Sequence, residues 1–75
     1  MKTYKDLNRD SGVAKYEYGT NFIRVKFKTG SVYLYTYRSA GQNHIEQMKT
    51  LADIGDGLNS YINKYVRKAY EAKEI

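Results

Sequence analysis

The chain has 75 residues, of which 41% are apolar and 15% aromatic, so it is long enough for one small domain and too apolar for a disordered segment. Thirteen Lys and Arg residues outweigh eight Asp and Glu residues and give a formal charge of +5. Cysteine is absent and there is one histidine, which excludes disulfides and thiolate metal sites and leaves no ligand set for a zinc ion.

The beginning of the chain has no apolar run of the kind found in signal peptides, and no segment approaches the roughly 20 apolar residues that span a membrane. We therefore expect a cytoplasmic protein, without a metal or other cofactor. Residues 1–10 are polar and aperiodic, which predicts a flexible N-terminal arm. Residues 11–75 are expected to form a single domain.

Two strands are predicted in the first half of the domain. The first covers residues 13–18, with Ala14, Tyr16 and Tyr18 on one face, and a turn signal follows at residues 19–21. Residues 22–28 then alternate clearly. One face carries Ile23, Val25 and Phe27, and the other carries Arg24, Lys26 and Lys28. This period of two is typical of a strand with one buried face.

A hairpin is predicted where Lys28-Thr29-Gly30 forms a three-residue loop, with Gly30 in the left-handed conformation. This loop pairs Val25 with Tyr33 and Ile23 with Tyr35, and it places Tyr33, Tyr35 and Tyr37 on the core face. A two-residue loop would shift the register by one and bury Val32 and Leu34 instead. The three-residue loop is favoured because it leaves basic side chains, not apolar ones, on the open face.

Two helices are predicted after a break at residues 39–41, where Ser39 is a candidate cap. The first covers residues 42–52, with apolar residues at helical spacing, and Gly55 fits the position after its end. Asp56 is a candidate cap for the second helix. The apolar stripe of that helix is Leu58, Tyr61, Ile62, Tyr65, Val66 and Ala69. The predicted fold is α+β: a three-stranded antiparallel β-meander followed by two α-helices packed on one face.

Two segments resemble the KTSC domain family, a group of small modules found alone in bacterial proteins and at the C-terminus of some lysyl-tRNA synthetases. The first is Ile23-x-Val25-x-Phe27-x-x-Gly30-x-Val32-Tyr33-x-Tyr35, which is similar to the family's central strand-turn-strand motif. The second is Gly55-Asp56-Gly57-Leu58-Asn59-x-x-Ile62-x-x-Tyr65, which is similar to its late glycine-rich segment. The resemblance covers residues 11–70 and implies an uncharacterised module for which RNA binding has been proposed.

One feature departs from the family pattern. Where the family usually has a valine-proline pair after its tyrosine motif, this chain has Tyr37-Arg38-Ser39-Ala40-Gly41. The route from the sheet into the first helix is therefore expected to differ.

The predicted open face of the sheet is the first candidate site. Arg24, Lys26 and Lys28 follow one strand there, and cations at this spacing suit a phosphate backbone. Lys15 and Arg38 are expected nearby, and Phe22 is a candidate for base stacking unless the N-terminal arm covers it. The alternative is an ordinary solvated sheet face.

A second basic cluster lies on the polar side of the last helix and contains Lys64, Arg67 and Lys68. Arg67 and Glu71 have the spacing of a surface ion pair, which is the alternative to a binding role. Tyr33 and Tyr35 are expected to pack in the core, Asn59 to hydrogen-bond the turn, and His44 to lie at the surface. None of these residues forms a recognisable catalytic set, so we expect no enzyme.

Two functions are consistent with these features. The first is a binding module that holds nucleic acid, RNA more than DNA, weakly through its phosphates. The second is a protein-interaction module or a homo-oligomer, in which the strand at residues 13–18 offers an exposed edge. Added salt should weaken the first kind of binding and spare the second.

Overall fold

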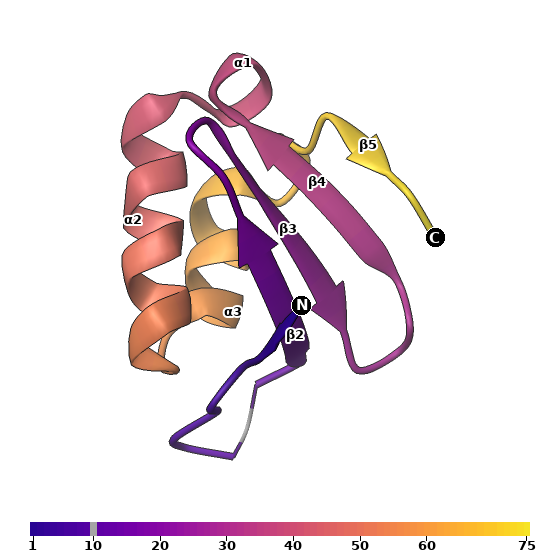
Figure 1. Cartoon of the computed structure of the whole chain (residues 1–75), viewed down its shortest axis with the longest axis vertical. Helices are drawn as coiled ribbons and strands as arrows, with labels where there is room; N and C mark the ends of the chain where they lie inside the picture. Colours follow the sequence, from indigo (N-terminus) through magenta and orange to yellow (C-terminus); the bar gives the residue numbers. More distant parts are fainter. Residues whose placement is uncertain (10) are drawn as a thin grey trace.

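The computed structural model describes residues 1–9 and 11–75. Its five strands form one antiparallel sheet in chain order. They are β1 (Lys2–Thr3), β2 (Val13–Tyr18), β3 (Phe22–Phe27), β4 (Val32–Thr36) and β5 (Ala72–Lys73). The helical elements are α1 (Tyr37–Ala40), α2 (Gln42–Ile54), α3 (Leu58–Tyr61) and the π-helical turn η1 (Ile62–Val66), which continues α3 (Figure 1).

The α+β class and the central meander β2-β3-β4 agree with the sequence prediction, but the number of strands does not. The two strands that the sequence misses, β1 and β5, add one short strand to each side of the meander. The prediction that residues 13–18 form an exposed edge is wrong in part, because Lys2 and Thr3 pair with Tyr16 and Lys15.

The predicted hairpin register is confirmed. Val25 pairs with Tyr33 and Ile23 pairs with Tyr35. The Phe27 N–H donates to the Ser31 carbonyl at 2.8 Å, and the three loop residues end at Gly30, whose φ is 98°. A side chain would be strained at that φ, so glycine at this position fixes the loop length and with it the face on which each residue lies.

The N-terminal segment is packed against the domain, in contrast to the predicted flexible arm. The Tyr4 ring belongs to the core, and the Tyr4 N–H donates to the Ala14 carbonyl at 2.9 Å. The Leu7 N–H donates to the Gly55 carbonyl at 2.8 Å. These contacts correct the prediction for residues 1–9, whereas residue 10 lies outside the described residues.

The route from the sheet to α2 contains a helical turn that the sequence does not predict. Thr36 caps α1: its side chain accepts from the Ser39 N–H, and its own N–H donates to the Ser39 hydroxyl, each at 3.0 Å. Ser39 therefore closes a capping box around α1 and does not cap α2, whose N-cap is Gly41. Tyr37 consequently leaves the strand and lies in α1, half-buried.

The connection between α2 and α3 agrees with the prediction at one residue and differs at another. Gly55 ends α2 in the left-handed conformation with φ at 83°. Gly57, not Asp56, is the N-cap of α3, and the Asp56 carboxylate instead accepts from the Asn8 amide at 2.7 Å. The last helical segment ends at Val66, earlier than the apolar pattern to Ala69 suggests.

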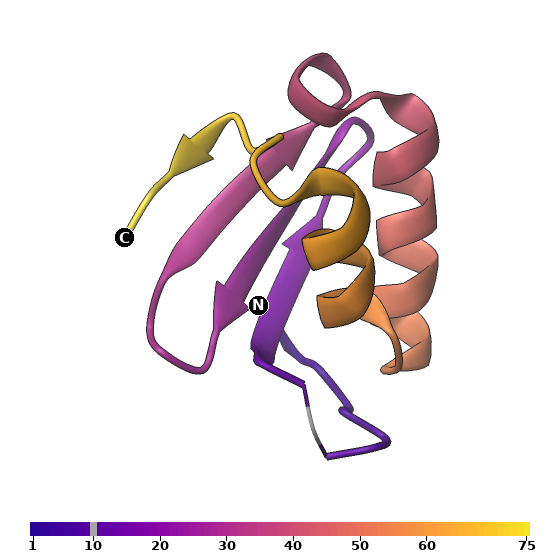
Figure 2. The ribbon, with the colours of Figure 1, turned by 180° about the vertical axis from the view of Figure 1, so that it is seen from behind.

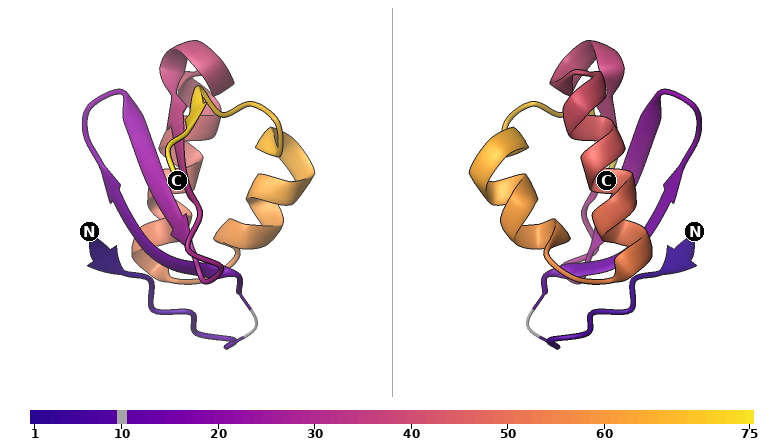
Figure 3. Two further views of the ribbon diagram at one scale, coloured as in Figure 1. Left: turned by 90° about the vertical axis from the view of Figure 1, so that its right-hand side faces the viewer. Right: turned by 90° about the vertical axis from the view of Figure 1, so that its left-hand side faces the viewer.

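The helices α2 and α3 cover the same face of the sheet, as Figures 2 and 3 show from two directions, and the opposite face has no helix over it. The core lies between the sheet and the helices. Ile23 and Val25 contribute to it from the sheet, and Ile45 and Met48 contribute from α2, each with 0% of its surface exposed. Tyr65 is an exception to the predicted apolar stripe, because it is 52% exposed and packs on His44 and Tyr61. In the part of the chain that is described, no helix has the length and apolar character needed to cross a membrane.

Candidate functional site

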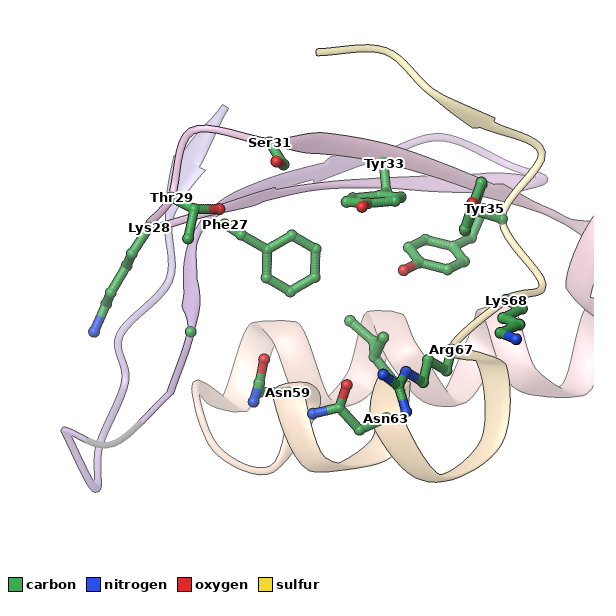
Figure 4. A pocket seen from close by; sticks show the side chains of 13 residues that line it. Phe27, Lys28, Thr29, Ser31, Tyr33, Tyr35, Asn59, Asn63, Arg67 and Lys68 are labelled. Carbon is green, nitrogen blue, oxygen red and sulfur yellow. The ribbon is translucent and has the colours of Figure 1, made fainter.

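A pocket of about 470 Å³ lies between the β3–β4 hairpin and the last helical segment. Figure 4 shows the sheet on one side and α3 with η1 on the other. The sheet side contributes aromatic rings and the helical side contributes amides and cations. Its principal lining residues are Phe27, Lys28, Tyr33, Tyr35, Asn59, Ile62, Asn63, Arg67, Lys68 and Tyr70. Pockets that bind small ligands typically have volumes of about 300–1,000 Å³.

The helical side of the pocket is a row of three polar residues, Asn59, Asn63 and Arg67, four positions apart. In a regular α-helix each step of four residues turns about 40° beyond a full circle, so the row would drift sideways. The wider π-helical turn η1 contains Asn63 and ends directly before Arg67, and it opposes this drift. All three side chains line the pocket; in Figure 4 the amides of Asn59 and Asn63 point towards the sheet, and Arg67 extends along the helix towards Asn63.

The sheet side of the pocket is aromatic. The rings of Phe27 and Tyr33 meet edge to face with centroids 5.6 Å apart, and Tyr70 meets Tyr33 in the same way at 4.9 Å. The Tyr33 ring stacks on that of Tyr35 at 6.5 Å. Such pairs hold one another in place, so the pocket has a pre-organised apolar surface.

Tyr35 is the buried member of this group, with 1% of its surface exposed. Its hydroxyl has no hydrogen-bond partner among the described residues, yet it is not an enclosed polar atom without a partner, so the oxygen itself must be accessible. The small exposed part of Tyr35 is therefore its hydroxyl, and it opens into the pocket that Tyr35 lines. Burial, with the neighbouring phenols of Tyr33 and Tyr70, raises the pKa of Tyr35 to about 12, so this hydroxyl keeps its proton at neutral pH.

The polar groups around the pocket are mostly free to meet a ligand. Asn59, Asn63, Arg67 and Lys68 make no side-chain hydrogen bond or ion pair within residues 1–9 and 11–75, and no carboxylate is among the described residues that line the pocket. Lys28 differs, because its ammonium group pairs with Asp6 at 2.8 Å. Lys28 is 54% exposed, so water screens this pair strongly.

On the open face of the sheet, the structure surrounds the predicted site residue Arg24 with carboxylates. Its guanidinium group contacts Glu17 at 2.7 Å and Glu74 at 2.5 Å. Its side chain is 28% exposed, and the bonds to the Glu74 and Glu17 carboxylates raise its pKa. The charge of Arg24 is therefore largely compensated within the chain.

The other residues predicted for this face are divided. Lys28 is not on it, because β3 ends at Phe27 and Lys28 lies in the hairpin loop, where it lines the pocket instead. Phe22 is half-buried, with the Arg24 guanidinium 5.4 Å from its ring centroid and Gly19 of the β2–β3 turn against its edge. Lys15 and Lys26 are paired in register. Arg38 is exposed on α1 and lines a second hollow with Phe22 and Arg24.

The second predicted cluster is divided by the structure. Arg67 and Lys68 line the pocket, whereas Lys64 lies over the ring of Tyr65, 5.3 Å from its centroid. The predicted Arg67–Glu71 ion pair is absent from the described part of the chain, because the helix ends before Glu71. The Glu71 carboxylate instead accepts from the Thr36 hydroxyl at 2.9 Å.

Sequence reasoning missed the pocket itself. Asn59 lines it and makes no side-chain hydrogen bond to the turn within the described residues, in contrast to the prediction, and Asn63 is a further lining residue that the sequence prediction does not include. The recurrence of polar residues at positions 59, 63 and 67 was the available signal. His44 is half-buried, with its Nδ1 2.6 Å from the Tyr61 hydroxyl, and the described residues contain no group of metal-ligating side chains.

No family model, no curated protein and no solved structure matches the chain.

Proposed function

We propose that this protein is a small non-enzymatic binding module that holds the phosphate backbone of nucleic acid at the hairpin end of the domain. The observation that carries the proposal is the pair Arg67 and Lys68, two exposed cations beside a pocket that has no carboxylate among its described lining residues. Lys28 lies at the same pocket. Clustered cations of this kind bind polyanions by releasing their condensed counterions.

The open face of the sheet adds two further cations at the same end of the domain. Lys15 and Lys26 face each other across β2 and β3, and neither makes an ion pair within the described residues. Like charges directly opposite each other destabilise a sheet, so an external anion would relieve this pair. Arg24 contributes less, because Glu17 and Glu74 already neutralise it.

RNA is the preferred ligand on the basis of the resemblance to the KTSC family, and the membership itself is part of the proposal. A protein partner is the alternative. Because β1 and β5 each cover two residues of a meander edge, strand addition would have to use these short strands or the uncovered ends of β2 and β4.

Fluorescence polarisation with labelled single-stranded RNA, duplex RNA and duplex DNA tests the proposal, at low and at physiological salt. We expect binding that weakens as salt is added. Arg67→Glu and Lys68→Glu should each weaken binding by about tenfold and reduce the salt slope by about one.

Lys64→Glu is the matched control, since it makes the same change of charge on η1 outside the pocket and should have a smaller effect. Lys26→Glu tests the sheet face separately, and an effect confined to that variant would move the interface there. Absence of binding to all three nucleic acids at low salt would overturn the proposal and favour a protein partner.

A further inference from the structure

We propose that the pocket between the β3–β4 hairpin and η1 accepts one unpaired base of the bound strand, with the phosphates on either side of that base held at the two ends of the pocket. This inference rests on the proposed function and deepens it, because it identifies single-stranded nucleic acid as the ligand. The base would stack on the aromatic surface formed by Phe27 and Tyr33, since every base has a face that stacks on such rings.

The polar groups of the pocket fit the edge of a base. A base carries donors and acceptors around its rim, and amide groups can satisfy either kind. Asn59 and Asn63 present two such amides, neither with a partner among the described residues. The protonated hydroxyl of Tyr35, inside an almost completely buried side chain, supplies a further donor and acceptor that the folded chain leaves unused.

The distribution of charge fits a strand that passes through the pocket. Figure 4 shows Lys28 at one end of the pocket and Lys68 at the other, with the aromatic surface between them. Arg67 lies on the same side as Lys68. A nucleotide within a strand has a phosphate on each side of its sugar, so cations at both ends match it better than they match a free nucleotide, which has its phosphate on one side.

An unpaired base is required by the geometry. The aromatic surface and the amides lie between two layers of the protein, and the bases of a duplex are stacked and paired inside the helix. The pocket therefore selects single strands, or loops and bulges of folded RNA, over regular duplex.

The test compares a short single-stranded RNA with an abasic strand of the same length and charge. We expect the RNA with bases to bind at least about fivefold more tightly, which is the low end of what one stacked base contributes. Asn63→Ala and Tyr35→Phe should bring this ratio towards one and leave the salt slope unchanged. Tyr65→Phe, on the exposed surface of η1, should leave the ratio as it is.

The outcomes separate the two proposals. Equal affinity for the abasic strand and the RNA would overturn the base pocket and leave phosphate binding intact, whereas absence of binding to both would overturn the proposed function. Competition by nucleoside monophosphates as effective as that by the RNA strand would contradict the assignment to a strand. Asn63 is exposed, so Asn63→Ala keeps the test valid if Tyr35→Phe lowers stability.

Discussion

The Tyr4 hydroxyl accepts a hydrogen bond from the backbone N–H of Leu58 at 3.2 Å, across 54 positions of sequence. Gly57, the N-cap of α3, has no side chain with which to cap the helix. The phenol oxygen of the N-terminal segment therefore satisfies the N–H of the first residue of α3, one of the N–H groups that have no partner within a helix. The start of α3 depends on residues that the sequence pattern assigns to a flexible arm.

Removal of that hydroxyl should lower stability. In Tyr4→Phe the Leu58 N–H loses its partner inside the core, where Tyr4 is only 4% exposed. We expect the free energy of unfolding to fall by about 1–2 kcal/mol, measured by urea denaturation. The same change at exposed Tyr65 should have a much smaller effect. An unchanged midpoint for Tyr4→Phe would mean that the bond contributes no net stability.

Two glycines distinguish backbone strain from crowding. Gly30 and Gly55 both have positive φ, at 98° and 83°. A methyl group at Gly30 would meet nothing within 4 Å, whereas at Gly55 it would lie 2.4 Å from the Cβ of Lys5. We expect Gly30→Ala to cost about 1 kcal/mol from strain alone. Gly55→Ala should cost more in the same thermal or urea melts, and equal costs would contradict the close approach of residue 5.

The capping box of α1 can be tested by a pair of substitutions at one position. Thr36→Ala removes the oxygen that accepts from the Ser39 N–H and should lower the free energy of unfolding by about 1 kcal/mol. Thr36→Ser keeps that oxygen and should retain most of the stability. If both variants lost the same amount in urea denaturation, the methyl group of Thr36 and not the cap would be responsible.

Stability should fall in strongly alkaline solution. Burial, with the hydrogen bond that the Tyr16 hydroxyl donates to Asp53 at 2.8 Å, raises the pKa of Tyr16 from 10.0 to about 12. The folded state thus holds this proton more tightly than the unfolded state does. The stability that the protonated Tyr16 hydroxyl contributes is therefore complete below pH 10 and is lost between pH 10 and 12. Urea midpoints across this range should fall less steeply for Tyr16→Phe.

Tyr65→Phe, which also removes one phenol but from the surface, controls for the loss of a titrating group. An identical alkaline slope in wild type and Tyr16→Phe would contradict this account.

The acid side has the opposite sign. Hydrogen bonds from Tyr18 and Tyr16 lower the pKa of Asp53, so the stability that this carboxylate contributes is present above its ordinary pKa of 3.8 and is lost as the pH falls below that value.

The parts of the fold that the sequence predicts are those with a regular period. Alternation in β3 and the glycine at position 30 determine the hairpin register, because a shift by one residue would expose the apolar set. The stripe of Ile45, Met48 and Ala52 identifies α2 in the same way, and all three are buried. In these segments the local pattern and the tertiary structure agree.

The missed parts have no local pattern to detect. A strand of two residues, such as β1 or β5, shows no period, and only pairing with a distant strand creates it. The ion pair through which Glu74 compensates the charge of Arg24 joins residues 50 positions apart. The pocket depends on a π-helical turn that brings Asn63 and Arg67 to the same side of the helix, and their polar character alone is equally typical of a solvated helix face.

Arg24 also contributes to how the C-terminal segment is held. From β3 its guanidinium group reaches Glu17 on β2 and Glu74 just after β5. The two-residue strand β5 is otherwise held by its pairing with β4 and by backbone hydrogen bonds of the residues on either side of it. Added salt screens partly exposed charges far more than it weakens the apolar core. The outermost strand should therefore open by itself at high ionic strength, as a local unfolding event in which the Glu74 amide exchanges its hydrogen with solvent while the amides of β3 remain protected.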